Sequence, residues 1–110
     1  NLIIKSETST NVEFISQLET LRGQIDKLDK ELVEVLSARM NLADKIGEYK
    51  KENSVTTFQQ SRWEAIYNTR RDWATKMNIN PDFISEVFKS VHAESVRRQE
   101  EIISSLSENA

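Results

Sequence analysis

The sequence predicts an all-α fold in which one long amphipathic helix is followed by two shorter helices. Apolar residues recur at heptad spacing along the first part of the chain, whereas acids, bases and amides occupy the other helical faces. The periodicity lapses between Glu52 and Phe58, and the helix-breaking run 78–82 separates two later apolar segments. The heptad positions form one seam: Phe14, Leu18, Leu21, Ile25, Leu28, Leu32, Val35, Leu42, Ile46 and Tyr49.

The long helix is expected to begin near Thr10 and to end near Lys51. Thr10 and Glu13 have the spacing of a capping box. Gly47, inside the helix, costs about 1 kcal/mol relative to Ala, and we explain it by the close approach of a neighbour or a ligand rather than by a break. We interpret residues 1–11 as a linker or the remnant of a longer chain.

The second helix is expected to start at Ser61 or a few residues earlier, and the third at Pro81. Ser61 opens another capping-box pattern, although the apolar positions that follow are irregular. Asn80 is a favourable N-cap, and proline suits the first helical position. The third helix is expected to end near Ser105. We also expect the two tryptophans and Met77 to pack in the core.

The composition favours a single domain that pairs with a second copy. The chain has 110 residues, of which 37% are hydrophobic and 30% are charged, so its own core is modest. The shorter helices cannot cover the whole seam, which favours a homodimer. We interpret residues 12–106 as one helical domain and residues 107–110 as a frayed tail.

Several functional classes are disfavoured by the composition. The net charge of -3 does not favour nucleic acid as a partner. The absence of cysteine leaves no disulfide or thiolate site and is consistent with a cytoplasmic protein. The single histidine has no clustered metal-ligating neighbours, so we expect no metal or other cofactor. No apolar run approaches the length of a membrane span.

Polar residues interrupt the apolar faces and predict a small pocket. Arg39 takes a seam position, and Lys50 points within about 20° of it, roughly 16 Å further along the axis. Such a pair suits a small anion. Ser95 and Gln99, four residues apart, interrupt the stripe of the third helix in the same way. That stripe comprises Ile84, Phe88, Val91, Ile102 and Leu106.

These residues also carry a resemblance to a known enzyme family. Over roughly residues 18–103, five blocks occur in the order found in the all-α class of chorismate mutases, which the chain resembles. No single block is diagnostic, but the ordered set is specific. The blocks are Leu21–Asp29, Ala38–Ala43, Ile46–Lys50, Ser61–Arg62 and Glu94–Gln99.

The resemblance implies an intertwined homodimer of three-helix subunits that rearranges chorismate to prephenate. This intramolecular Claisen rearrangement needs no nucleophile, metal or cofactor; the site restricts the conformation of a dianion and stabilises developing charge. Arg22 would enter from the other subunit. Geometry agrees, because Arg22 and Arg39 lie about 25 Å apart along one helix. The remaining implied site residues are Arg39, Lys50, Gln59, Arg62, Ser95 and Gln99.

The resemblance also implies a role for each of these side chains. The three arginines would bind the two carboxylates through bidentate contacts. Lys50 and Gln99 would donate hydrogen bonds to the breaking ether oxygen, and Ser95 would help to orient the substrate. Arg39, Lys50 and Gln99 are the expected catalytic residues.

The chain departs from the family pattern at two positions. Trp63 stands where the family has an acidic residue that contacts the substrate hydroxyl, and Gln59 stands where aspartate is frequent. Glu64 would compensate only if the helix were turned by one residue. The loss of the acid opens a second interpretation, because isochorismate-pyruvate lyases resemble this family and can lack it.

Structural explanations remain open for the same residues. Arg39 could pair with Asp29 or Asp44, and Ser95 with Gln99 could fix helix register. We expect His92 to be exposed and assign it no role. The chain could also be a non-catalytic helical dimerisation or regulatory module, fused to or associated with another enzyme of aromatic biosynthesis.

Overall fold

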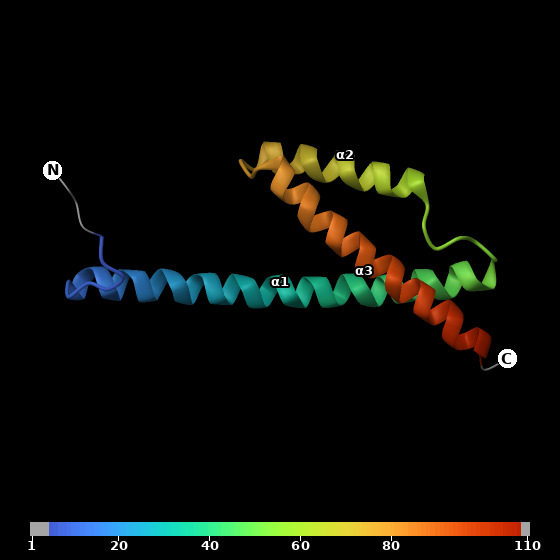
Figure 1. Cartoon of the computed structure of the whole chain (residues 1–110), viewed down its shortest axis with the longest axis horizontal. Helices are drawn as coiled ribbons and strands as arrows, with labels where there is room; N and C mark the ends of the chain where they lie inside the picture. The colour runs from blue at the N-terminus through green and yellow to red at the C-terminus, as the bar shows by residue number, and fades with distance from the viewer. Residues whose placement is uncertain (1–4, 109–110) are drawn as a thin grey trace. The chain divides into compact units, whose positions relative to one another are not determined.

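The computed structural model describes residues 5–108, and within them it contains three helices and no strand: α1 (Val12–Glu52), α2 (Gln60–Lys76) and α3 (Pro81–Glu108) (Figure 1). The predicted all-α fold is therefore confirmed. Parts of the predicted linker and tail, residues 1–4 and 109–110, lie outside the described residues. So does the side chain of Leu106.

The three helix starts test the predicted caps. At α1 the cap is Asn11, not Thr10, because Asn11 Oδ1 accepts a hydrogen bond from the Phe14 amide at 3.1 Å. Asparagine caps helices at least as well as threonine, so the start moves by one residue. The expected Asn80 cap of α3 is confirmed, since its Oδ1 accepts a 2.9 Å bond from the Asp82 amide.

The predicted capping box at Ser61 is wrong. Helix α2 begins at Gln60, and its N-cap residue, Gln59, makes no side-chain capping bond. Glu64 instead accepts a 3.3 Å hydrogen bond from Gln60 within the first turn. Because the helix already begins at Gln60, Ser61 lies within its first turn and is not its N-cap; the extended residue 59 is.

Helices α1 and α2 end in the same way, with a left-handed residue. Ser54 has a φ of 55° and Asn78 a φ of 59°. After each, an amide bonds back to a carbonyl five residues earlier: Val55 to Lys50 and Ile79 to Ala74, both at 2.9 Å. This Schellman arrangement satisfies terminal carbonyls and turns the chain sharply toward the next helix.

The chain divides into two compact units at residue 37. The described part of the first unit, residues 5–37, contains the N-terminal part of α1. Its seam residues are largely exposed, with 56% of Leu21, 62% of Leu28 and 64% of Val35 accessible. Nothing within residues 5–37 covers them. No helix among residues 5–108 is long and apolar enough to cross a membrane.

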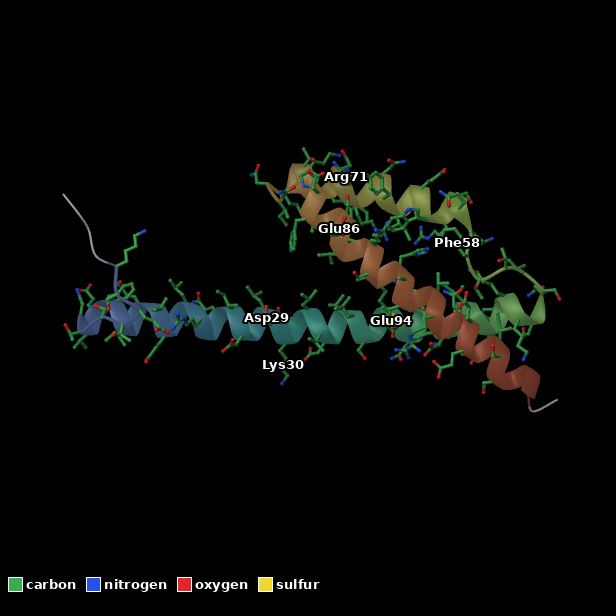
Figure 2. The ribbon with its side chains drawn as sticks, in the orientation of Figure 1. Asp29, Lys30, Phe58, Arg71, Glu86 and Glu94 are labelled. Carbon is green, nitrogen blue, oxygen red and sulfur yellow. The ribbon has the colours of Figure 1, made fainter. Side chains whose placement is uncertain are left out.

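The second unit begins at residue 38, and its described part contains the end of α1 together with α2 and α3. Helix α2 packs on α3. Arg71 of α2 ties the two together by donating to Asp82 at 2.9 Å and to Ser85 at 2.7 Å; Figure 2 labels this arginine on α2. The buried apolar residues of this unit are Met40, Ala43, Ile66, Ala74 and Val91.

Two residues that we expected in the core are exposed. Trp73 is 48% accessible and Met77 is 68% accessible. Trp73 carries the guanidinium of Arg70 4.6 Å above its ring, so one face of the indole is covered by a cation rather than by apolar side chains. The irregular apolar pattern of α2 leaves these positions off the side that packs on α3.

Gly47 marks the crossing of α1 and α3, and the expected close neighbour is present. A Cβ added at Gly47 would lie 3.0 Å from the Gln99 Cα, which is a main-chain atom. Alanine at this position would therefore push the helices apart. The glycine allows Gln99 to lie directly against α1.

We predict that Gly47→Ala destabilises the fold by about 1–2 kcal/mol, because the overpacking at Gln99 exceeds the gain of about 1 kcal/mol in helix propensity. Gly23→Ala is the matched control: it lies in the same helix, and its added methyl group meets nothing within 4 Å. Thermal unfolding followed by circular dichroism measures both. Equal or greater stability of Gly47→Ala relative to Gly23→Ala contradicts the close packing.

Candidate functional site

The second unit holds a cavity of about 340 Å³ between its three helical segments. We call it the site cavity. Its walls come from α1, from the loop before α2, from α2 and from α3. The lining residues are Arg39, Leu42, Ala43, Ile46, Lys50, Thr57, Gln59, Arg62, Ile66, Arg70, His92, Ser95 and Gln99.

Six of the seven site residues that the sequence suggested line this one cavity. They are Arg39, Lys50, Gln59, Arg62, Ser95 and Gln99. The seventh, Arg22, is an exposed residue of the first unit and is not among the lining residues. Glu64 does not line the cavity either, so it does not replace the acid missing at Trp63.

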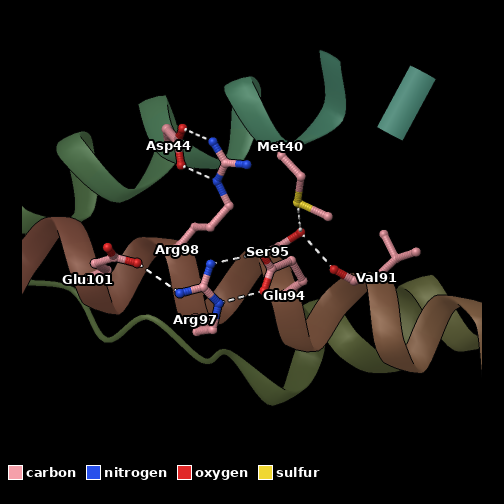
Figure 3. Close-up of polar contacts among 8 residues, drawn as sticks. All are labelled: Met40, Asp44, Val91, Glu94, Ser95, Arg97, Arg98 and Glu101. Carbon is pink, nitrogen blue, oxygen red and sulfur yellow. Dashed lines mark hydrogen bonds and ion pairs between the residues drawn. The ribbon is translucent and has the colours of Figure 1, made fainter. Parts of the chain in front are cut away.

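Arg39 is anchored by a buried serine. Its Nη1 donates a 2.6 Å hydrogen bond to Ser95 Oγ, and Ser95, only 4% exposed, donates in turn to the Val91 carbonyl at 3.0 Å. Figure 3 shows Ser95 between Val91 and Met40, whose sulfur lies 3.6 Å from the hydroxyl. The guanidinium is thus held in place while most of its donors stay available.

Among the described residues, Asp44 pairs with Arg98 and not with Arg39. Arg98 donates two hydrogen bonds to Asp44, of 2.9 and 2.6 Å (Figure 3). These bonds are the main cause of the lowered pKa of Asp44. Arg97 similarly binds Glu94 and Glu101. These carboxylates are therefore paired outside the site cavity.

The site cavity has a surplus of positive charge. None of its described lining residues is acidic, whereas Arg39, Lys50, Arg62 and Arg70 are cationic. Burial lowers the pKa of Arg39, and the nearby charge of Arg62 lowers it further. Burial also lowers the pKa of Arg70, and the nearby charges of Arg62 and Arg39 lower it further. Mutual repulsion among unpaired cations is relieved by a bound anion, so the cavity is suited to a ligand with more than one negative charge.

Arg70 is a site residue that the sequence prediction missed. It lies on α2 four residues after Ile66 and eight after Arg62, and all three line the site cavity. This i, i+4, i+8 spacing places them on one helical face and was the available signal. Arg70 also lies against Trp73 and Phe88, with its guanidinium carbon 4.6 and 5.6 Å from the two ring centres.

Lys50 connects the end of α1 to the loop before α2. Its Nζ donates a 2.8 Å hydrogen bond to the Thr57 carbonyl, and the Thr57 hydroxyl donates to Glu100 at 3.2 Å. Burial lowers the pKa of Lys50. An ammonium has three donors, so this contact leaves Lys50 able to bind a ligand oxygen.

Three buried polar side-chain atoms have no hydrogen-bond partner among the described residues, and all three belong to the site cavity. They are Arg70 Nε, His92 Nε2 and Gln99 Oε1. Buried polar groups are nearly always paired, so a cluster of unpaired ones marks a place where a ligand is expected.

The expectation that His92 is exposed is wrong. The residue is half-buried, with its ring 5.2 Å from that of Trp63 and 5.9 Å from that of Phe58. His92 precedes Ser95 by three residues and Gln99 by seven, so it shares their helical face. That spacing was a signal for its place in the site.

Comparisons with known proteins identify the family of the chain. Residues 21–100 match the family model described as chorismate mutase type II. The chain belongs to the chorismate mutase type II family. The blocks that suggested the resemblance lie within the matched residues, and so do all seven of the site residues named from them.

Several curated relatives of this chorismate mutase type II chain are longer proteins, and the chain matches only a part of each. It is 32% identical over 81 residues to the T-protein of Enterobacter agglomerans, and 31% identical over 84 residues to that of Haemophilus influenzae. These matches cover 74% and 76% of the chain but only 22% of each relative. The 4-amino-4-deoxychorismate mutase of Streptomyces pristinaespiralis is 27% identical over 88 residues, which is 80% of the chain and 68% of that protein.

We predict that Ser95→Ala weakens binding of a cyclic dicarboxylate about three- to ten-fold, because Arg39 loses the acceptor that holds its guanidinium in place. Ser85→Ala is the matched control. Ser85 accepts a 2.7 Å bond from Arg71 and donates to the Pro81 carbonyl in the same way, but it does not line the site cavity. Calorimetric titration compares the two variants; equal losses of affinity would remove the anchoring role.

Proposed function

We propose that this chain rearranges chorismate to prephenate in the site cavity. The observation that carries the proposal is the convergence of six family-position side chains on one cavity with four cations and no acid among its described lining residues. Chorismate is a dicarboxylate, and its charge complements this lining. The chain spans about a fifth of the length of the T-proteins it matches, and we assign it this one step alone.

The rearrangement requires the protein to position the substrate and to stabilise developing charge, and it requires no reactive protein group. The flexible side chain of chorismate must fold over the ring before the ether bond breaks and the new carbon–carbon bond forms. In the proposed complex, Arg39 and Arg62 bind the carboxylates, and the anchoring of Arg39 by Ser95 sets the position of one end. Because the hydrogen bond from Arg39 to Ser95 is present without a ligand, the arginine loses less conformational entropy when the ligand binds.

Lys50 and Gln99 are proposed to stabilise the negative charge that grows on the ether oxygen. Both line the site cavity, and Gln99 is only 6% exposed. Donors in a water-poor site act more strongly on developing charge than they would in bulk water. The crossing at Gly47 supports this role, because it fixes the main chain of Gln99 against α1.

We propose that the working assembly is a homodimer in which Arg22 completes the site of the other subunit. One observation and the family resemblance support this assembly. The seam of α1 is exposed along the first unit, with more than half of Leu21, Ile25 and Leu32 accessible. The resemblance implies that Arg22 enters from the other subunit. A second copy would bury the seam and bring in this arginine.

We also propose that residues 12–106 work as one domain attached to, or associated with, another enzyme of aromatic biosynthesis. Relatives support this. A protein of Buchnera aphidicola named bifunctional chorismate mutase/prephenate dehydratase is 27% identical over 88 residues, which is 23% of its length.

An isochorismate-pyruvate lyase is the second candidate, and one observation favours it. Trp63 replaces the expected acid, and no other carboxylate among the described lining residues takes its place. Product analysis separates the candidates. Loss of chorismate absorbance with formation of prephenate supports the mutase, whereas formation of salicylate and pyruvate from isochorismate supports the lyase. A non-catalytic module gives neither product.

We predict that Arg39→Ala lowers kcat/KM for chorismate at least a hundred-fold while the helical circular dichroism signal is retained, because a bidentate contact to a carboxylate is lost. Arg71→Ala is the control, since Arg71 makes comparable hydrogen bonds between α2 and α3 but does not line the site cavity. Turnover by Arg39→Ala at the level of Arg71→Ala would eliminate the proposed role.

We predict that Gln99→Glu is active only in acidic solution. An amide donates a hydrogen bond at any pH, whereas a carboxyl group donates only when protonated, so activity of the variant falls as pH rises through the pKa of the new group. The parent chain should show no such fall above neutral pH. Matching pH–rate profiles for the two proteins would contradict the contact between Gln99 and the ether oxygen.

A further inference from the structure

His92 lines the site cavity without a part in the proposed mechanism. It also lines a neighbouring hollow of about 520 Å³ next to Phe58, Trp63 and Val96, which we call the aromatic groove. Trp63 stacks on the imidazole, with an interplanar angle of 28°, and Phe58 meets it edge-on at 64°. Aromatic neighbours on two sides restrict the ring, so His92 presents its nitrogen in a defined direction.

The hydrogen-bonding capacity of His92 is not used by the described part of the chain. Its Nε2 is buried and has no partner among those residues. A neutral imidazole that carries its proton on Nδ1 can accept a hydrogen bond at Nε2, and leaving a buried Nε2 unpaired is unfavourable. A ligand group that donates to Nε2 removes this cost, so the nitrogen favours a ligand with a donor at that point.

The surroundings keep the imidazole neutral. Burial lowers the pKa of His92, and the nearby positive charges lower it further; those charges are on Arg39, Arg62 and Lys50. Arg70 adds a fourth cation to the site cavity. On the aromatic groove, the charged neighbours are Lys89, Arg97 and Glu100, of which only Glu100 is acidic.

We propose that neutral His92, resting on Trp63, accepts a hydrogen bond from the ring substituent of the substrate, and that the site thereby selects a hydroxyl over a protonated amine. This inference rests on the proposed function. It also assigns a role to Trp63, whose indole stacks on the imidazole. The chain lacks the acid expected at this position, and His92 provides an uncharged acceptor instead.

Charge decides between the two substituents. Some relatives are named 4-amino-4-deoxychorismate mutases, and an alkyl amine carries a positive charge at neutral pH. Four cations and no described carboxylate line the site cavity, so an ammonium group is repelled there. A hydroxyl group brings no charge and donates to His92. The favoured substrate is therefore chorismate rather than its 4-amino analogue.

The experiment measures kcat/KM for chorismate and for 4-amino-4-deoxychorismate at neutral pH. The parent chain is compared with His92→Leu, which removes the acceptor, and with His92→Gln, which keeps one. His92→Glu supplies a carboxylate for the amine. Val96→Ala is the matched control, because Val96 lies one turn further along α3 and lines the aromatic groove but not the site cavity.

The parent is expected to favour chorismate at least ten-fold. His92→Leu should lose about five- to ten-fold in kcat/KM for chorismate, the effect of one hydrogen bond, and His92→Gln should recover most of it. His92→Glu should move the preference toward the amine, whereas Val96→Ala should leave the preference unchanged. A structural role alone predicts no change in the ratio between substrates.

The other outcomes separate the two proposals. If the parent converts chorismate but prefers the amine, or if His92→Leu keeps the parent's preference, the role of His92 is overturned while the proposed function stands. If the parent converts neither substrate, the proposed function fails, and the inference fails with it.

The pH profile is an independent measurement that does not need the leucine variant to fold. Below the lowered pKa of His92 the imidazole becomes a cation and can no longer accept, so kcat/KM of the parent should fall there, at a pH below the ordinary histidine range. His92→Gln should lack this fall. If kcat/KM of the parent and of His92→Gln falls in the same way at acidic pH, the inference is overturned.

Discussion

The close contact between α1 and α3 at Gly47 is the constraint on which the site depends. It brings the main chain of Gln99 against α1, and one turn earlier on α3 it places Ser95 within reach of Arg39. The two helices therefore meet through a glycine and two buried polar side chains as well as through the apolar Met40. Such a contact is weaker than an apolar one as a source of stability, but it leaves donors and acceptors beside a cavity.

The charge of the site cavity depends on where the acidic side chains lie as much as on where the basic ones lie. Asp44 and Glu94 lie near the same crossing, yet each is held by an arginine that does not line the site cavity. The ion pairs on the outer face thus keep the inner arginines uncompensated, which suits them to a ligand that carries two negative charges.

The sequence was most informative where a polar residue broke a regular pattern. Arg39 in the heptad seam, and Ser95 with Gln99 in the stripe of α3, were found because apolar residues resume on either side, and all three line the site cavity. The start of α3 followed from the chemistry of Asn80. These predictions needed only the helical period and the capping preferences of single residues.

Features that depend on which helix faces which were harder to predict. The spacing of Arg70 from Arg62, and of His92 from Ser95, puts each on a shared helical face, but only the packing of α2 on α3 shows that these faces line the site cavity. The partner of Arg39 was equally ambiguous, because an aspartate and a serine were both within plausible reach and the crossing decided between them. The cap at Ser61 failed for a local reason: an extended residue 59 already provides the helix start.

The bond from Lys50 to the loop before α2 has an evolutionary consequence. Lys50 binds the main-chain carbonyl of Thr57, and every amino acid supplies that oxygen. The amino acid at position 57 can therefore change during evolution while Lys50 is retained, provided that the backbone of the loop keeps its conformation. The side chain at position 57 is in this way free to vary without disturbing the bond to Lys50.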